Sequence, residues 1–550
     1  MKKPEKPQKS EKTQKVAKNK AAHKPSKAST PLDNGENFFS LLGEPFESDI
    51  RINLDAAFNE DDSAVELFID FLESCKSDDL SDDDRNDLID DLLEALTDLR
   101  VGANNGDRRA REDILEIYDL LEDDLDEKAL SLPDIMMVGK IFSDAGLDVP
   151  EILKQSAADA FEAFSPAPHE IASGDILSPF REVIGQAQEN PFEAYEFMVS
   201  MLASFPTEYG LALLNELIFQ KDARLNHALL GFLLHPDPAY GETVASGLTQ
   251  MATNTQNESL AIERLLRMRP WEPESRQCQI DTVIKAMRLK ALPPVQVKPP
   301  KLIKCYASAC DGAGTMTIMA TMRSGQSYQI CSIMNKISGV SDVLVLEHMP
   351  KMQMDMIIRQ LKSSIQTHEI NVEGIRRLLG LAIAENHACE VLPPFRLVEA
   401  CEILGIGTIP PDHSSVPELF SYLLSELRPN QIDKKAIDNA HQSILDCELT
   451  ENWFEAGEAF ENLLYPVKGK ARRVKKVLNN YLPYRREFWA RQCAFSALAL
   501  CGDKKTASAN SLWLQLALVG REIASDRSLD EIPLMIKIAA ISVEAFEHQE

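Results

Sequence analysis

Leu292-Pro-Pro-Val-Gln-Val-Lys-Pro-Pro300 separates two kinds of hydrophobic pattern in this chain. Its four prolines cannot continue a helix and favour a stiff, extended connection. Before this stretch, apolar residues recur at helical spacing; after it, short runs rich in strand-forming residues follow, and then helical spacing returns. The sequence therefore predicts a mainly α, multi-domain chain of helix pairs (α-α superhelix-like) with a small α+β insertion.

Residues 301–366, directly after this linker, have the composition of a small α+β module. Its strand-like runs are Leu302–Ala309, Met316–Met322, Tyr328–Met334 and, as a fourth, Val343–Leu346. The breaks are Asp311-Gly-Ala-Gly314 and Arg323-Ser-Gly-Gln326, which suit hairpin turns. A helix carrying Met352, Met356, Ile357 and Leu361 is expected to cover one face of the sheet.

Residues 175–291, on the other side of the linker, read as paired helices punctuated by proline and aspartate. The pairs begin near Pro191, Asp222 and Asn257, about 31 and 35 residues apart, close to the period of known helical repeats. The segment Phe232-Leu-Leu-His-Pro-Asp-Pro-Ala-Tyr240 resembles the turn between the helices of HEAT-type repeats. The resemblance covers about residues 190–290 and implies an elongated concave binding surface.

Residues 36–148 form an expected acidic helical domain. Apolar residues recur at helical spacing in three segments, and Asn104-Asn105-Gly106 separates two of them. Residues 59–130 carry 26 Asp or Glu against seven Lys or Arg, so the acidic faces are expected to point outward. Its beginning, residues 36–58, is rich in Phe, Leu and Ile and reads as a short extended or hairpin-like lead or as a docking segment.

The two ends of the chain differ in kind. Residues 1–35 are rich in Lys, Pro, Ser and Ala and contain no aromatic residue, which predicts a disordered Lys-rich tail. Residues 370–550 are expected to form a C-terminal helical domain, interrupted at Pro393-Pro394 and Pro410-Pro411 and closed by helices at about 506–524 and 529–547.

Composition excludes several classes of protein. The net charge is −28, so the chain as a whole is a poor match for nucleic acid or anionic lipid. No stretch is apolar enough to cross a bilayer, and the N-terminus lacks the apolar core of a signal peptide, which favours a cytoplasmic protein without membrane contact. The ten cysteines are scattered without a Cys-x-x-Cys pair, as expected for reduced, buried thiols.

No motif specifies a reaction, a metal or a cofactor. The Asp311–Gly314 stretch lacks the complete glycine-rich patterns of phosphate-binding loops, and a strand is expected to follow it. Cys305, Cys310 and Cys331 lack the spacing and the fourth ligand of a zinc site. We therefore assign no catalytic residue, and the chain is more readily interpreted as a non-enzyme.

Residues 465–491 are the candidate site, because nine cations stand there against the single acidic Glu487. The predicted binding residues are Lys468, Lys470, Arg472, Arg473, Lys475, Lys476, Arg485, Arg486 and Arg491. Tyr465, Tyr481, Tyr484 and Trp489 stand among them. Such a patch can dock an acidic surface, which includes the chain's own residues 59–130, can bind unpaired bases, or can be only a solvated face.

We expect a non-enzymatic scaffold or adaptor that binds another protein through its helix-pair surfaces and its segregated charge. The first alternative is an RNA- or ribosome-associated factor that uses the basic tail and patch. The second is an enzyme with its site in the 301–366 module, near Asp311, Arg323 and Asp342. The partner's identity and the oligomeric state are open at this level.

Overall fold

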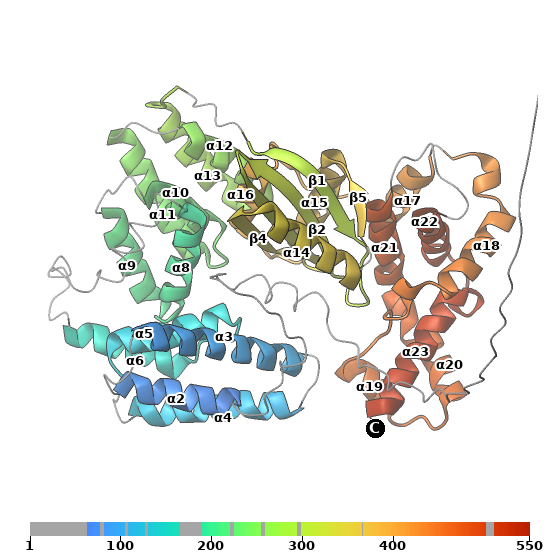
Figure 1. Cartoon of the computed structure of the whole chain (residues 1–550), viewed down its shortest axis with the longest axis horizontal. Coiled ribbons are helices and arrows are strands. Elements are labelled where there is room, and N and C mark those ends of the chain that lie inside the picture. Colours follow the sequence, from blue (N-terminus) through green and yellow to red (C-terminus); the bar gives the residue numbers. More distant parts are fainter. Residues whose placement is uncertain are drawn as a thin grey trace, which may run out of the picture. The chain divides into compact units, whose positions relative to one another are not determined.

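The computed structural model describes most of the chain after residue 62. The described ranges are 63–76, 82–104, 108–126, 130–164, 190–219, 225–254, 259–293, 299–365, 367–425, 427–501 and 511–549. The expected disordered tail, the apolar lead at 36–58 and residues 294–298 of the proline-rich linker lie outside them. The described part belongs to one compact unit, Asn34–Glu550, and is mainly α with one small antiparallel sheet, as expected (Figure 1).

In the described ranges, four helices lie within the expected acidic domain of residues 36–148 and a fifth follows it. They are α2 (Ala64–Lys76), α3 (Asp82–Asn104), α4 (Arg108–Asp126), α5 (Leu132–Asp144) and α6 (Glu151–Phe164). The break between α3 and α4 falls at Asn104-Asn105-Gly106, as the sequence predicts. Phe68, Leu96 and Leu121 are buried in the shared core, so the acidic residues are left to the outer faces of these helices.

Three consecutive helix pairs follow (Figure 1). They are α8 (Pro191–Ala203) with α9 (Thr207–Phe219), α10 (Asn226–Leu229) and η2 (Leu230–Leu234) with α11 (Pro238–Asn254), and α12 (Ser259–Met268) and η3 (Arg269–Trp271) with α13 (Glu274–Arg288). The turn at 232–240 connects η2 to α11, where the backbone N–H of Ala239 donates to Asp237 Oδ1 at 2.9 Å. Asp237 therefore caps the helix that the sequence places there.

A five-stranded antiparallel sheet follows the linker, in the order β4-β3-β2-β1-β5. Its strands are β1 (Lys301–Ser308), β2 (Met316–Ser324), β3 (Ser327–Lys336), β4 (Gly339–Met349) and β5 (Thr367–Ile370). The first four are the expected strands. The fifth begins just past residue 366 and pairs with the second half of β1, from Cys305↔Ile370 to Ser308↔Thr367.

Helices cover both faces of the sheet. The helix α14 (Lys351–Ser364) lies on one face, where Met354, Ile357 and Leu361 pack against Met319 and other strand residues. Met352, which was expected in this contact, is instead 80 % exposed, and Met354 takes the inward position. The other face packs into the main core against α15 (Val372–Ala388) and α16 (Arg396–Ile403).

The remaining helices form the C-terminal part. They are α17 (Val416–Leu424), η4 (Pro429–Gln431), α18 (Lys434–Leu445), η5 (Glu448–Thr450), α19 (Glu458–Leu464), α20 (Lys470–Asn480), α21 (Leu482–Leu500), α22 (Leu512–Ile523), η7 (Leu529–Glu531) and α23 (Pro533–Gln549). Both expected proline interruptions fall between helices, and the two expected closing helices correspond to α22 and α23. In the described ranges, no helix is both long and apolar enough to span a bilayer.

Candidate interaction surface

Eight of the nine basic residues of 465–491 lie on two consecutive helices, and Lys468 stands just before the first of them. Gly469 precedes α20 with φ +93°, a left-handed conformation that glycine adopts without strain, and Pro483 stands in the first turn of α21. Only Val477 and Leu478 of α20 are buried, whereas α21 is buried along most of its length. The helix α20 therefore lies on the surface with one face outward, and α21 belongs to the core.

Two cations of α20 form ion pairs with carboxylates of α23. Lys470 Nζ lies 3.1 Å from Glu544 Oε2, and Arg473 Nη1 lies 3.1 Å from Glu547 Oε1. Arg473 also donates to the carbonyl of Val467 at 2.8 Å, and its guanidinium lies over the ring of Phe546. Arg473 is largely buried in the contact of α20 with α23, whereas the Lys470–Glu544 pair is exposed and adds little stability.

The three cations of α21 are also paired inside the protein. Arg485 Nε donates to Glu455 at 2.9 Å, and Arg491 forms an ion pair with Glu385. Arg486 donates to three backbone carbonyls at the C-terminal end of α22, those of Ile523, Ser525 and Arg527. Arg486 thus satisfies acceptors that a helix end leaves without partners.

The four other cations point outward. We define the α20 cationic face as Lys468, Arg472, Lys475 and Lys476. Lys468, Arg472 and Lys475 are exposed and Lys476 is partly exposed. Within the described ranges, none of the four has an ion pair or a hydrogen bond. Three positive charges on one face of α20, and a fourth just before the helix, therefore have no counter-charge of their own.

The aromatic residues divide in the same way. Trp489 is buried and donates to Glu455 Oε1 at 2.7 Å, and Tyr481 packs edge-on against Phe460. Tyr484 and Tyr465, in contrast, are 89 % and 58 % exposed. Two phenol rings close in sequence to the α20 cationic face are therefore accessible, and the Tyr465 ring lies edge-on to Phe546 of α23.

The residues considered for an enzyme site do not converge. Asp311 binds its own hairpin turn, where it accepts a hydrogen bond from the backbone N–H of Thr315 at 2.8 Å. Arg323 lies at the β2–β3 hairpin, whereas Asp342 pairs with Met334 near the opposite end of β3. The length of the sheet therefore separates Arg323 from both Asp311 and Asp342.

The strand cysteines are buried thiols. Burial raises the pKa of Cys305 to about 11 and that of Cys310 to about 12. The pKa of Cys331 also lies well above its ordinary value because the thiol is fully enclosed. A protonated thiol is a poor nucleophile and a poor metal ligand. Among the described residues, no cluster of three His, Cys, Asp or Glu side chains is arranged to hold a metal.

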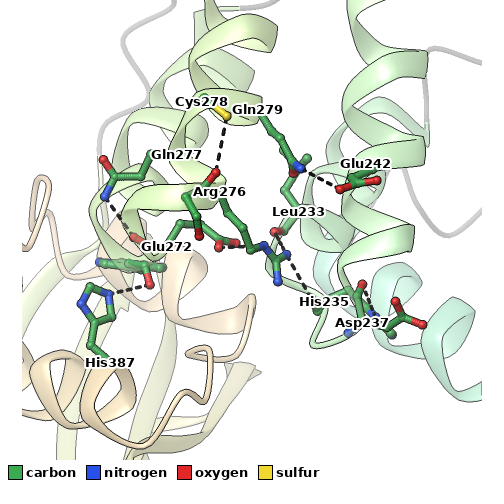
Figure 2. A network of polar contacts seen from close by, with 12 residues as sticks. Leu233, His235, Asp237, Glu242, Glu272, Arg276, Gln277, Cys278, Gln279 and His387 are labelled. Atoms are coloured by element: carbon green, nitrogen blue, oxygen red, sulfur yellow. Dashed lines mark hydrogen bonds and ion pairs between the residues drawn. The ribbon is translucent and has the colours of Figure 1, made fainter.

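A buried polar network that sequence reasoning missed links η3 and α13 to their neighbours (Figure 2). Arg276 Nε lies 3.1 Å from Glu272, and Arg276 Nη2 donates to the carbonyls of Leu233 and His235. Glu272 is 1 % exposed, and burial raises its pKa to about 7 although Arg276 opposes this. His387 Nε2 lies 2.8 Å from the carbonyl oxygen of Trp271, which connects this network to α15.

A second missed cluster surrounds Arg396 at the start of α16. Arg396 Nε donates to Glu196 at 2.6 Å, and the same guanidinium lies 3.4 Å from Glu399. Glu399 is 7 % exposed, and burial raises its pKa to about 7 against the pull of Arg396. Glu196 and Glu399 are about 200 positions apart in sequence, so no local motif could have indicated the cluster.

The fold and this surface define a mainly helical protein with a small β module and a cationic helix face. Residues 206–291 match the family model described as the Y4lR second domain, and residues 418–547, which include α20, match the Y4lR C-terminal helical domain. The matching family models are therefore those of Y4lR domains rather than of HEAT repeats. The uncharacterized protein y4lR of Sinorhizobium fredii is 21 % identical over 428 residues, which cover 74 % of this chain and 79 % of that protein. No solved structure matches.

Proposed function

We propose that this protein is a non-enzymatic, cytoplasmic scaffold or adaptor that binds an acidic protein surface through the α20 cationic face. The observation that carries the proposal is the division of the nine basic residues. Five are bound to the protein's own carboxylates and carbonyls, and four stand on α20 or directly before it without partners among the described residues. Like charges on one helix face repel each other, so their concentration favours an opposite charge from outside.

The helix pairs between Pro191 and Arg288 supply a second binding surface in this proposal. Their resemblance to HEAT-type pairs implies a stack whose concave side accommodates an extended partner. An adaptor needs two such surfaces, and the α20 cationic face lies outside the helix pairs in the sequence.

RNA binding is the second candidate, and the exposed tyrosines favour it. Tyr484 and Tyr465 can stack on unpaired bases while the four cations contact phosphates. The net charge of −28 opposes it, because a polyanion approaches an acidic protein against long-range repulsion. We therefore rank the acidic protein surface first.

Affinity purification of the full chain, coupled to mass spectrometry, tests the proposal. The variant reverses Arg472 and Lys475 to Glu, and the matched control reverses Lys434 and Lys435 to Glu on α18, all four of which are exposed. We expect a set of acidic protein partners that the control variant retains and the α20 variant loses. Treatment with nuclease should leave this set unchanged, and added salt should weaken it.

Three results would contradict the adaptor function. Partners that disappear with nuclease would favour the RNA candidate. Identical partner sets for the α20 variant and the wild-type protein would leave the α20 cationic face as a solvated surface. Loss of the same partners from the control variant would show only a general dependence on net charge.

A further inference from the structure

The helices α17 and α22 leave an open groove between them. Its volume is about 330 Å³, at the lower end of the range for sites that hold small ligands or single side chains. The lining residues are Pro417, Phe420, Ser421, Leu424, Arg521, Ala524 and Ser525. Phe420 and Leu424 are buried and form an apolar floor, while Ser421 and Ser525 are exposed at the rim.

Arg521 is the one charged residue that lines this groove. In the part of the chain that the structure describes, its guanidinium makes no hydrogen bond, ion pair or ring contact. The neighbouring Glu522 does not neutralise it, because Arg527 Nη1 binds that carboxylate at 2.9 Å. The two rim hydroxyls donate within their own helices, Ser421 to the carbonyl of Pro417 and Ser525 to that of Glu522.

This arrangement defines the chemistry of an occupant. An apolar floor removes a large aliphatic or aromatic side chain from water, and a lone guanidinium at the edge forms charge-assisted hydrogen bonds with a carboxylate. The groove therefore fits a short peptide segment in which apolar side chains stand beside Asp or Glu. A phosphate-rich ligand would leave the floor of Phe420 and Leu424 without a partner.

We propose that this groove binds residues 36–52 of the same chain. Their sequence is Glu36-Asn-Phe-Phe-Ser-Leu-Leu-Gly-Glu-Pro-Phe-Glu-Ser-Asp-Ile-Arg-Ile52, which combines three Phe and two Leu with three Glu and one Asp. One side chain among Phe38, Phe39, Leu41 and Leu42 supplies the apolar anchor, and Glu36 or Glu44 supplies the carboxylate for Arg521. The proposal does not depend on the α20 cationic face, because different helices build the two surfaces.

A long stretch of chain joins the proposed occupant to the described residues. The described residues begin at Ser63, and residues 40–62 lie between it and the Phe38–Phe39 pair. Such a segment spans up to about 80 Å when fully extended. Closing a loop of this length has a modest entropic cost, since the cost rises only with the logarithm of loop length.

Limited digestion of the full chain with chymotrypsin, which cleaves after Phe and Leu, tests the proposal. We expect cleavage within 36–52 to be slow in the wild-type protein and about tenfold faster in Arg521→Glu, as the loss of one charge-assisted hydrogen bond predicts. Arg521→Lys should keep most of the protection. Combining Arg521→Glu with Glu36→Lys and Glu44→Lys should restore it, because the charges are then exchanged.

The control is Lys435→Glu on α18, an exposed reversal that should leave the cleavage rate unchanged. A reciprocal measurement guards against misfolding of the Arg521 variants. In Phe38→Ala/Phe39→Ala, whose substitutions lie outside the groove, hydrogen exchange at 417–425 should become faster. Equal cleavage of the wild-type protein and Arg521→Glu, or unchanged exchange at 417–425 in the double alanine variant, would overturn the proposal.

Discussion

Glu272 shows how one buried carboxyl group determines part of the pH dependence of stability. Its ion pair with Arg276 favours the charged form, whereas burial favours the neutral form. Burial has the larger effect, since neither carboxyl oxygen receives a hydrogen bond from the described residues. The result is a pKa of about 7 against an ordinary value of 4.5.

The sign of this effect follows from proton binding. Between about pH 4.5 and pH 7 the folded protein keeps the Glu272 proton that the unfolded chain has lost, so the free energy of unfolding falls as pH rises. We expect Glu272→Gln to remove this slope. Between pH 5 and pH 8, its free energy of unfolding should rise relative to that of the wild-type protein by up to about 3 kcal/mol. Urea unfolding of both proteins at the two pH values measures it.

The matched control for this substitution is Glu274→Gln, two residues further along and exposed. It should leave the pH dependence of the wild-type protein unchanged. If the urea midpoints of Glu272→Gln and the wild-type protein change in parallel with pH, burial does not hold the proton on Glu272. In Glu272→Gln, Arg276 still has the carbonyls of Leu233 and His235 as acceptors, so its guanidinium is not left without partners.

At the scale of elements, two hairpin glycines of the sheet allow the cost of backbone strain to be distinguished from the cost of lost packing. Gly325 has φ +62° and a substituent there would meet open space, whereas Gly339 has φ +102° and lies directly against α15. A Cβ at Gly339 would overlap the Ala382 carbonyl oxygen and the side chain of Asn386. Asn386 is fully buried and binds the next residue, accepting from the backbone N–H of Val340 at 2.9 Å.

We therefore expect the same substitution to have unequal costs at the two turns. Gly325→Ala should lower the free energy of unfolding by about 1–2 kcal/mol, the strain of a left-handed alanine. Gly339→Ala should lower it by about 3 kcal/mol or more, because it also displaces a buried hydrogen-bonded amide. Urea unfolding of both variants measures the difference, and equal losses would show that the β3–β4 turn moves away from α15 without cost.

The sequence predicts elements wherever the pattern is local. The three helices of residues 64–126, the helix pairs and the first four strands follow from spacing and from turn residues such as Gly325. The strand β5 could not be predicted in this way, because Thr367-His-Glu-Ile370 is short and is a strand only through pairing with β1. The sequence also places Met352 rather than Met354 against the sheet. Two methionines within one helical turn do not indicate which of them faces inward.

For the candidate site, the sequence predicts only that basic residues are concentrated at 465–491. The nine cations are visible in the sequence, but their division into inward and outward groups depends on distant carboxylates. Glu385, Glu455, Glu544 and Glu547 come from three segments of the chain and bind four of the nine. Arg521 gives no sequence signal at all, because its isolation follows from the pairing of Glu522 with Arg527.

At the scale of the whole molecule, the linker at 292–300 joins parts that also contact each other directly. Arg264 of α12 is 5 % exposed and binds Glu402 of α16 through two hydrogen bonds of 2.9 Å. Trp271 Nε1 donates to the carbonyl of Ile409 at 3.0 Å, and the rings of Phe192 and Phe395 lie 4.8 Å apart. These contacts belong to the single compact unit, so the covalent linker is not the only connection across this boundary.

We therefore expect the two parts to stay together after the linker is cut. In a protein with an engineered protease site at 295–297, the fragments should co-elute on gel filtration after cleavage. Arg264→Ala leaves the Glu402 carboxylate inside without its strongest partner, at a cost of about 3–5 kcal/mol, and should let the cut fragments separate at low concentration. Replacing both residues with apolar ones, as in Arg264→Met with Glu402→Leu, should restore part of the co-elution, because a packed apolar pair needs no counter-charge, while Arg267 keeps only Glu263 as an ion-pair partner among the described residues. Separation of the cut wild-type protein would mean that the linker, rather than this buried junction, holds the helix pairs to the β module.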